Sequence, residues 1–112
     1  MERNKTRPNY KSLKKNLLVL NNYAKQHHLN AVEIPMPGDV IVNNFNTPAS
    51  YMNFIFLNGA ILVPTFGDRL DEHVLNLFRQ HSGGREVIGV DSRILTFGQG
   101  GMHCISMQVP VF

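Results

Sequence analysis

The sequence is poor in cysteine and lacks tryptophan. Cys104 is the single cysteine among 112 residues, so no internal disulfide can form and a disulfide scaffold is excluded. No apolar run approaches the roughly 20 residues that span a bilayer, and the charged residues 1–7 are not followed by the apolar segment of a signal peptide. These absences predict a cytoplasmic protein without a membrane partner, in a compartment where thiols stay reduced.

Nucleotide, metal and redox motifs are also missing. The chain has no Walker loop, no Rossmann fingerprint, no HExxH and no paired CxxC. Gly98-Gln99-Gly100-Gly101 precedes a segment that we predict as a strand, so it lacks the helix N-terminus that would hold a phosphate. His27 and His28 are neighbours on a predicted helix and point to different faces, which disfavours a metal site. We therefore expect neither a metal nor an organic cofactor.

The formal net charge of +3 is unevenly distributed. Residues 1–30 carry seven Lys or Arg against one acid, whereas the other 82 residues carry four Arg and seven acids, a balance of −3. A basic segment can mark contact with nucleic acid or simply the solvated face of a helix. No aromatic residues interleave with these charges as a stacking surface requires, which favours the solvated helix and makes a nucleic-acid partner unlikely.

One amphipathic helix is predicted in the basic segment. Asn9 is a candidate N-cap, and the helix should run to about His27. Apolar residues recur at spacings of three and four, which puts them on one face that we expect to be core. These residues are Tyr10, Leu13, Leu17, Leu20 and Ala24.

Strand patterns follow this helix. Ala31–Pro35 and Val40–Val42 are predicted as strands, and the polar residues 43–50 as a loop. Residues 51–57 and 60–65 are rich in β-forming side chains and flank Asn58-Gly59, the preferred dipeptide of a type I′ turn. A β-hairpin is therefore predicted here.

A second helix and further strands complete the pattern. Asp68 is the predicted cap of this helix, Asp71 and Glu72 suit its first turn, and Ser82-Gly83-Gly84 ends it. Its expected buried stripe consists of Leu70, Val74, Leu77 and Phe78. Three later segments are expected to be extended: a strand over residues 86–90 that would be buried on both faces if it were central, a short extension over 92–97 and a last strand over 104–109.

Cys104 follows the glycine loop, and its residue type allows two interpretations. Free cysteine is among the most buried residue types, which favours a structural thiol. Glycines let a backbone approach a ligand closely, and a thiol beside such a loop can be a nucleophile. The local residues alone do not decide between the two.

Four blocks of the sequence resemble the C-terminal part of agmatine deiminases, members of the guanidine-modifying superfamily with the bacterial-type peptidylarginine deiminases. The blocks are residues 48–54, 58–68, 85–93 and 98–105. The resemblance covers residues 31–112 well and the helix within residues 1–30 more loosely. It implies an α/β fold, a five-bladed α/β propeller of ββαβ modules, of which this single 112-residue domain would be the C-terminal blade region.

The resemblance also implies a chemistry. Cys104 takes the position of the family nucleophile, which would convert agmatine to N-carbamoylputrescine and ammonia through an amidino-cysteine intermediate, a step towards putrescine. Gly98, Gly100 and Gly101 would leave room for the substrate head. His103 matches a histidine beside the nucleophile that does not transfer the proton, and a regular strand would turn it away from the thiol. Asn53 is predicted to order a loop rather than to bind substrate.

The departures from the family limit this expectation. The substrate-holding carboxylates and the catalytic His-x-Asp pair belong to upstream blades, and none of the eight carboxylates here aligns with them. Gln99 replaces a usual glycine, and Met107 replaces a usual polar residue. We therefore expect no activity from this chain alone, and association through exposed apolar faces, as a homo-oligomer or with a complementing N-terminal deiminase fragment. The alternative is a non-enzymatic oligomeric interaction module.

Overall fold

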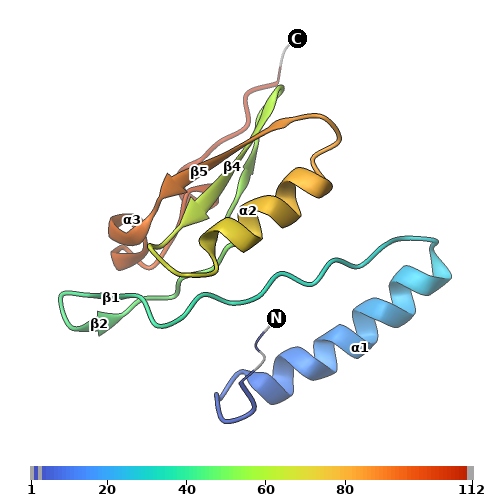
Figure 1. The fold of residues 1–112 in the computed structure, drawn as a ribbon, viewed down its shortest axis with the longest axis horizontal. Coiled ribbons are helices and arrows are strands. Elements are labelled where there is room, and N and C mark those ends of the chain that lie inside the picture. Colours follow the sequence, from blue (N-terminus) through green and yellow to red (C-terminus); the bar gives the residue numbers. More distant parts are fainter. Residues whose placement is uncertain (1, 3, 111–112) are drawn as a thin grey trace. The chain divides into compact units, whose positions relative to one another are not determined.

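The computed structural model describes residue 2 and residues 4–110, which form two compact units that meet in the sequence at Met36 and Pro37 (Figure 1). Each unit is described by itself. Along the described residues, no helix combines the length and the apolar character needed to cross a bilayer.

The first unit contains the predicted helix, α1 (Tyr10–Gln26). Asn9 occupies the N-cap position, but its side chain makes no capping hydrogen bond. The expected apolar stripe is not a core, because Ala24 is the one buried residue of the helix and Leu20 is 58% exposed. A unit of one helix and one extended segment offers too little surface to cover an amphipathic face.

Ala31–Pro35 does not form the predicted strand. The segment has no regular secondary structure and belongs to neither sheet of the described chain. An alternating apolar pattern becomes a strand only when a neighbouring strand supplies its hydrogen bonds.

The second unit begins with a small hairpin of β1 (Ile41–Val42) and β2 (Phe45–Asn46), which pair antiparallel. Asn43 and Asn44 connect them with φ of 49° and 64°, the positive values that both central residues of a type I′ turn require. The predicted strand at residues 40–42 is confirmed for β1. The predicted loop over 43–50 is wrong at β2, because asparagine tolerates the left-handed conformation and lets the chain reverse here.

A three-stranded sheet in the order β3-β4-β5 forms the centre of the second unit. β3 (Ile55–Phe56) and β4 (Ala60–Thr65) form the predicted hairpin around Asn58-Gly59, with Phe56 opposite Ile61. Neither turn residue has a positive φ, so the type I′ turn predicted here is wrong. β5 (Glu86–Asp91) runs parallel to β4 and is connected to it by α2 (Asp71–Gln80), which gives the order strand, strand, helix, strand.

β5 is an edge strand, so the burial on both faces that a central position would have given it is not observed. Its residues are half-buried or exposed, and Ile88 is 39% exposed. β4 takes the central position instead, with Ile61 and Val63 only 2% and 0% exposed. A continuous apolar run indicates that both faces of a strand can be buried, but it does not show that this chain provides the elements that would pack on both faces.

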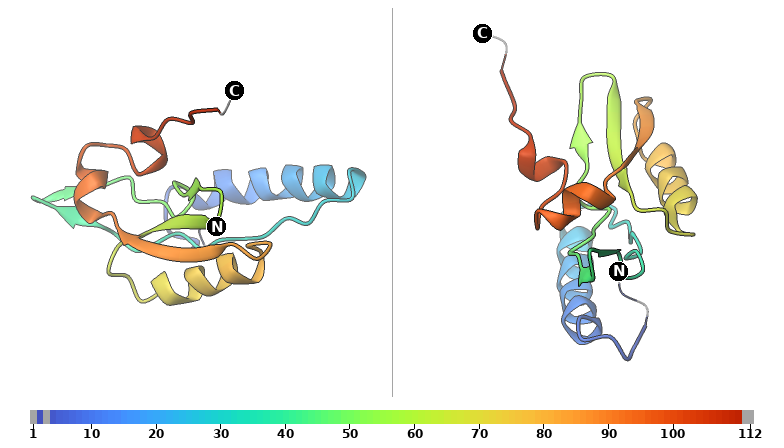
Figure 2. Two further views of the ribbon diagram at one scale, coloured as in Figure 1. Left: turned by 90° about the horizontal axis from the view of Figure 1, so that it is seen from above. Right: turned by 90° about the vertical axis from the view of Figure 1, so that its left-hand side faces the viewer.

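α2 packs on one side of the sheet, whereas residues 99–110 lie on the other side next to β3 (Figure 2). The buried residues of α2 are Val74, Leu75 and Phe78, while Leu70 and Leu77, which were also predicted to be buried, are half-buried. A Cβ on Gly89 of β5 would come within 3.1 Å of the Leu75 side chain, so glycine at this position permits the close approach of helix and strand.

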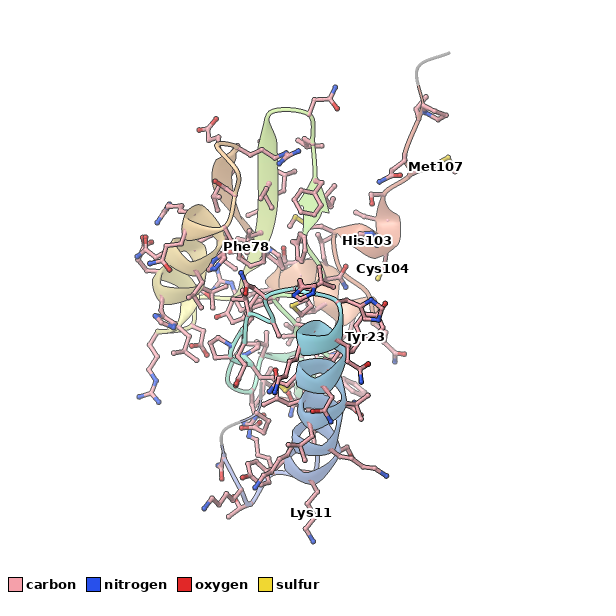
Figure 3. All side chains as sticks on the ribbon, turned by 90° about the vertical axis from the view of Figure 1, so that its right-hand side faces the viewer. Lys11, Tyr23, Phe78, His103, Cys104 and Met107 are labelled. Atoms are coloured by element: carbon pink, nitrogen blue, oxygen red, sulfur yellow. The ribbon has the colours of Figure 1, made fainter. Side chains whose placement is uncertain are left out.

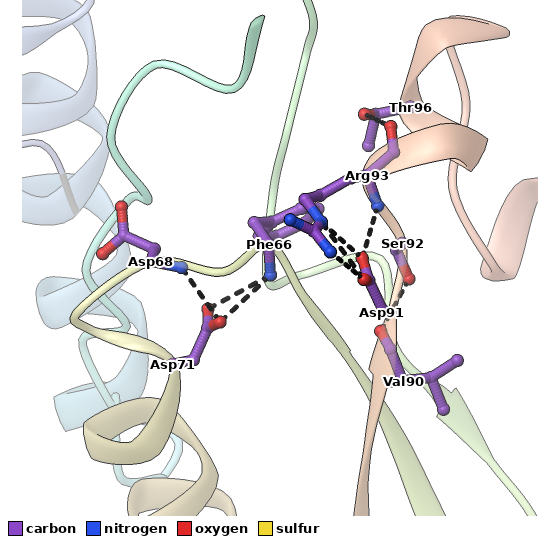
Figure 4. A network of polar contacts seen from close by, with 8 residues as sticks. All are labelled: Phe66, Asp68, Asp71, Val90, Asp91, Ser92, Arg93 and Thr96. Carbon is purple, nitrogen blue, oxygen red and sulfur yellow. Dashed lines mark hydrogen bonds and ion pairs between the residues drawn. The ribbon is translucent and has the colours of Figure 1, made fainter. Parts of the chain in front are cut away.

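The start of α2 is fixed by two aspartates (Figure 4). The helix begins at Asp71, not directly after Asp68, whose Oδ1 instead accepts a hydrogen bond from the Leu70 N–H at 2.8 Å. Asp71 and Glu72 lie in the first turn as predicted, and Gly83 and Gly84 after the helix have φ of 63° and 85°. Glycine ends the helix because it adopts these values without a Cβ clash.

The last part of the chain differs most from the prediction. Residues 93–97 form a helix, α3 (Arg93–Phe97), instead of an extension. Residues 103–105 form a 3₁₀ helix (His103–Ile105), and the rest of the predicted strand over 104–109 is irregular. The turn closes locally, since both the N–H and the hydroxyl of Ser106 donate to the His103 carbonyl, at 3.1 and 2.8 Å.

Candidate functional site

The glycine loop connects α3 to the 3₁₀ helix rather than to a strand. It starts as the C-terminal cap of α3, where the Gly98 N–H donates to the Leu95 carbonyl at 3.1 Å. Gln99 has a φ of 61°, in the left-handed region that favours glycine. This conformation explains why glycine would suit the position, and it places the loop directly before the turn with the thiol.

Cys104 lies in the middle of the 3₁₀ helix and is exposed (Figure 3). Asn53, in the segment before β3, is its side-chain partner: Nδ2 donates to Sγ at 3.4 Å. The Asn53 Oδ1 accepts a hydrogen bond from the His103 N–H at 2.9 Å. One amide side chain therefore contacts both the thiol and the backbone that carries it.

The pKa of the Cys104 thiol is lowered by its surroundings. The largest cause is the hydrogen bond from the Asn53 side chain, followed by the backbone of Gly101, because both stabilise the thiolate. Exposure keeps the opposing effect of desolvation small. A lowered pKa and an exposed position are the properties of a reactive cysteine, not of a buried structural one.

The three glycines predicted to bind substrate have different surroundings. A Cβ on Gly101 would lie 2.6 Å from Cγ and Nδ2 of Asn53, and a Cβ on Gly100 would lie 3.2 Å from the Cβ of Cys104. A Cβ on Gly98 would meet nothing closer than the Leu95 carbonyl at 3.5 Å, an ordinary contact. Packing within the chain thus accounts for glycine at 100 and 101, but not at Gly98, where a Cβ would make only an ordinary contact.

His103 precedes the thiol in the same helical turn. The expected alternation of a strand does not apply, because the two residues belong to a 3₁₀ helix. His103 lines an open groove between the β3–β4 hairpin and the C-terminal segment, and Cys104 does not line it. The apolar lining of this groove includes Met52, Phe54, Phe56, Met107 and Val109.

The other groups that a guanidine-hydrolysing site needs do not contact the thiol. Within the described residues, its hydrogen-bond partners are Asn53 and backbone, with no carboxylate or imidazole. Asp71 binds the backbone around Phe66, and Asp91 pairs with Arg93. No three His, Cys, Asp or Glu side chains of the described chain are placed to hold a metal.

Cys104 was singled out from the sequence, but its hydrogen-bond partner was not. Asn53 was predicted only to order a loop, and the structure adds the contact with the thiol across 51 residues of sequence. A signal was present, since Asn53 lies in the first of the four resembling blocks and Cys104 in the last.

The chain is similar to known proteins along most of its length. The sequence model of the Porphyromonas-type peptidyl-arginine deiminases matches residues 1–110. A protein of Marinomonas sp. (strain MWYL1) assigned as an agmatine deiminase is 33% identical over 104 residues, covering 78% of this chain and 28% of that protein. A Lactococcus lactis protein with the same assignment is 36% identical over 89 residues, covering 77% and 23%.

Solved structures show the same similarity. A C. jejuni agmatine deiminase superposes with a TM-score of 0.81 at 26% identity, covering 93% of this chain and 32% of that one. These neighbours confirm the predicted α/β fold class. The chain spans 23% to 32% of the length of these three relatives.

Proposed function

Because this chain belongs to the Porphyromonas-type peptidyl-arginine deiminase family, we propose that it is the nucleophile-bearing C-terminal portion of an agmatine deiminase-like hydrolase. The observation that carries the proposal is Cys104, an exposed thiol of lowered pKa three residues after the last glycine of the loop. The unit β3-β4-α2-β5 would be one ββαβ blade of a five-bladed propeller, and Gly98, Gly100 and Gly101 would leave room for the substrate head.

The proposed reaction starts from the Cys104 thiolate. Sγ attacks the guanidinium carbon and forms a C–S bond, and the bond from that carbon to one nitrogen breaks as ammonia leaves with a proton from a general acid. Water then attacks the amidino carbon, the C–S bond breaks, and the thiolate is restored with release of the urea product. With agmatine the products are N-carbamoylputrescine and ammonia. Neither a metal nor an organic cofactor enters these steps.

Two groups of this reaction must come from elsewhere. A guanidinium needs carboxylates that orient it and an acid that protonates the leaving ammonia, and the described residues bring neither to Cys104. We propose that a complementing N-terminal deiminase fragment, or another copy in an oligomer, supplies them. Peptidyl arginine is the alternative guanidine substrate.

A complementation assay tests this function. The full chain is mixed with the upstream portion of a deiminase relative and supplied with agmatine or an arginine peptide, and ammonia release is measured. We expect release only from the mixture, a loss of about 10³-fold or more in Cys104→Ala, and little change in Ser12→Ala, at an exposed hydroxyl of α1. Release by the chain alone, or full release by Cys104→Ala, would contradict the proposal.

The second candidate is a non-enzymatic oligomeric module, which the exposed apolar side chains favour. Leu18 and Val19 of α1 are 61% and 62% exposed, and Ile94 and Met107 of the second unit are 79% and 88% exposed. Such surfaces promote association. An oligomer in solution whose Cys104 is not labelled faster by a haloacetamidine than by a neutral alkylating reagent would support this candidate against the hydrolase.

A further inference from the structure

We propose that Asn58-Gly59, the turn of the β3–β4 hairpin, is a site of spontaneous deamidation, in which the side-chain amide of Asn58 becomes a carboxylate. The proposal does not rest on the proposed function, because the reaction needs only water and the chain itself. Both residues line the open groove between this hairpin and the C-terminal segment. The modification would therefore change the chemistry of that groove.

The reaction is an attack by the backbone on the side chain. The Gly59 nitrogen gives its proton to hydroxide and forms a bond to Cγ of Asn58, and the bond from Cγ to Nδ2 breaks as ammonia leaves with a proton from water. Water then opens the succinimide ring. Cleavage of the new bond at Cγ leaves an aspartate, whereas cleavage at the backbone carbonyl carbon leaves an isoaspartate, in which the main chain runs through the side chain. The net change is the consumption of one water and the release of one ammonia.

The first argument is that nothing holds the two reacting groups. Both residues are exposed, and among the described residues neither the Asn58 side chain nor the Gly59 N–H has a hydrogen-bond partner. The turn is closed by other groups. The Leu57 N–H donates to the Ala60 carbonyl at 2.8 Å, and the Gly59 carbonyl accepts from the Glu86 N–H at 3.0 Å. The amide and the nitrogen that attacks it can therefore approach each other in water.

The second argument is the glycine. A Cβ on Gly59 would meet nothing within 4 Å, and its φ is not positive, so neither packing nor backbone conformation accounts for glycine here. Without a Cβ, the Asn58 side chain can come close to the nitrogen that follows it. Asn43 offers a comparison within the chain. It is also exposed in a two-residue turn, between β1 and β2, but Asn44 follows it and brings a Cβ.

The product changes both the charge and the backbone of the turn. An aspartate at position 58 adds a negative charge to a groove whose lining already includes Glu86. An isoaspartate also lengthens the main chain by one methylene beside Gly59, whose carbonyl binds the Glu86 N–H where β4 and β5 begin to pair. We therefore expect the modified chain to be more acidic and to unfold at a lower urea concentration than the unmodified chain.

The test follows the full chain during incubation without agmatine, in neutral and in mildly alkaline buffer. Trypsin releases residues 26–69 as one peptide that contains both Asn58 and Asn43, and tandem mass spectrometry identifies which amide has become a carboxylate. We expect Asn58 to convert while Asn43 keeps its amide, at a rate that rises with hydroxide concentration. Ammonia release should reach a single equivalent per chain and then stop.

Gly59→Ala is the matched variant, because its Cβ has open space and an ordinary φ. We expect it to slow the conversion of Asn58 by about tenfold or more, since a small misplacement of reacting atoms strongly slows an intramolecular attack. Circular dichroism checks that the variant folds.

Three results overturn the proposal: an Asn58 amide that persists as long as that of Asn43, equal rates in Gly59→Ala and the unaltered chain, or conversion only in urea-unfolded chain. Cys104→Ala should convert at the unaltered rate. The proposed function is tested separately, by ammonia release that continues in proportion to added agmatine, so failure of one proposal is distinguishable from failure of the other.

Discussion

In each of two polar clusters of the second unit, one side chain makes hydrogen bonds both to another side chain and to backbone groups, but the two clusters differ in their surroundings. In the Asp71 cluster, one carboxylate accepts hydrogen bonds from the Tyr51 hydroxyl at 2.7 Å and from the backbone N–H groups of Phe66 and Asp68 at 3.2 and 3.0 Å. In the Asn53 cluster, one amide contacts the thiol of Cys104 and the backbone of His103. Each connects segments that lie apart in the sequence.

The difference between them is burial. Tyr51 and Phe66 are 1% and 5% exposed, whereas Cys104 and His103 are exposed. A buried polar group that loses its partner keeps its desolvation cost, so the Asp71 cluster stabilises the fold. An exposed group can turn to water, so we expect the Asn53 cluster to contribute little to stability.

The largest effect that follows is on stability. Asp71→Ala removes the partner of three donors, two of them on buried residues, and should lower the free energy of unfolding by about 2–4 kcal/mol. Glu72→Ala is the matched control in the same helical turn, because the partner of Glu72 among the described residues is Arg79 at the surface, and it should cost less than about 0.5 kcal/mol. Urea unfolding followed by circular dichroism measures both.

The comparison fails if Asp71→Ala and Glu72→Ala destabilise equally. It also fails if Asn53→Ala lowers the free energy of unfolding as much as Asp71→Ala does. Under native conditions, Glu72→Ala should leave the rate of Cys104 alkylation by iodoacetamide unchanged, since Glu72 makes no hydrogen bond with Asn53 or Cys104.

A smaller effect appears at alkaline pH. Burial, and then the hydrogen bond to Asp71, raise the pKa of Tyr51 well above its ordinary value of about 10. The contribution of the neutral phenol is therefore complete below about pH 10 and is lost as pH rises from there towards the folded pKa, by up to about 1.4 kcal/mol per pH unit.

Tyr51→Phe removes this dependence. We expect it to cost about 1 kcal/mol at pH 7 and to flatten the loss of stability above pH 10. Tyr23→Phe, at a tyrosine that is 54% exposed, should change neither. Urea midpoints at pH 7, 10 and 11 measure the effect, and parallel pH curves for Tyr51→Phe and the unaltered chain would refute it.

The features of the fold that could be predicted from the sequence are those set by interactions between residues close together in the chain. α1, α2 and the β3–β4 hairpin were predicted correctly in position, because spacing, acidic first turns and a two-residue turn are local signals. The type of turn was not predicted correctly. The left-handed residues are Asn43 and Asn44, while Asn58-Gly59 turns without positive φ. Residue preference shows which conformations are permitted, and the flanking strands select among them.

Predictions that depended on a partner surface were wrong. The pattern of residues 104–109 suits a strand, but a local 3₁₀ turn satisfies the first of these residues instead. Likewise, the apolar face of α1 was identified from its spacing, but its burial was not. For the site, resemblance located Cys104, whereas the contact with Asn53 joins residues 51 apart and leaves no periodic trace.

The smallest predicted effect concerns a third polar group, the ion pair of Asp91 and Arg93. This pair has several hydrogen bonds but is exposed, so it tests whether burial or the number of hydrogen bonds decides the contribution to stability. Arg93 binds the Asp91 carboxylate through Nε and Nη2, and its backbone N–H adds a bond at 3.1 Å, yet both side chains are more than half exposed (Figure 4). The Arg93 guanidinium and backbone hold the pKa of Asp91 below its ordinary value, so any stabilisation exists above about pH 4 and is lost as pH falls through the folded value. Because solvent screens this pair, Arg93→Gln should shift the urea midpoint at pH 7 by no more than its experimental error, and 1 M NaCl should leave that result unchanged. A loss comparable with that of Asp71→Ala would show that the number of hydrogen bonds, not their burial, decides which cluster holds this fold together.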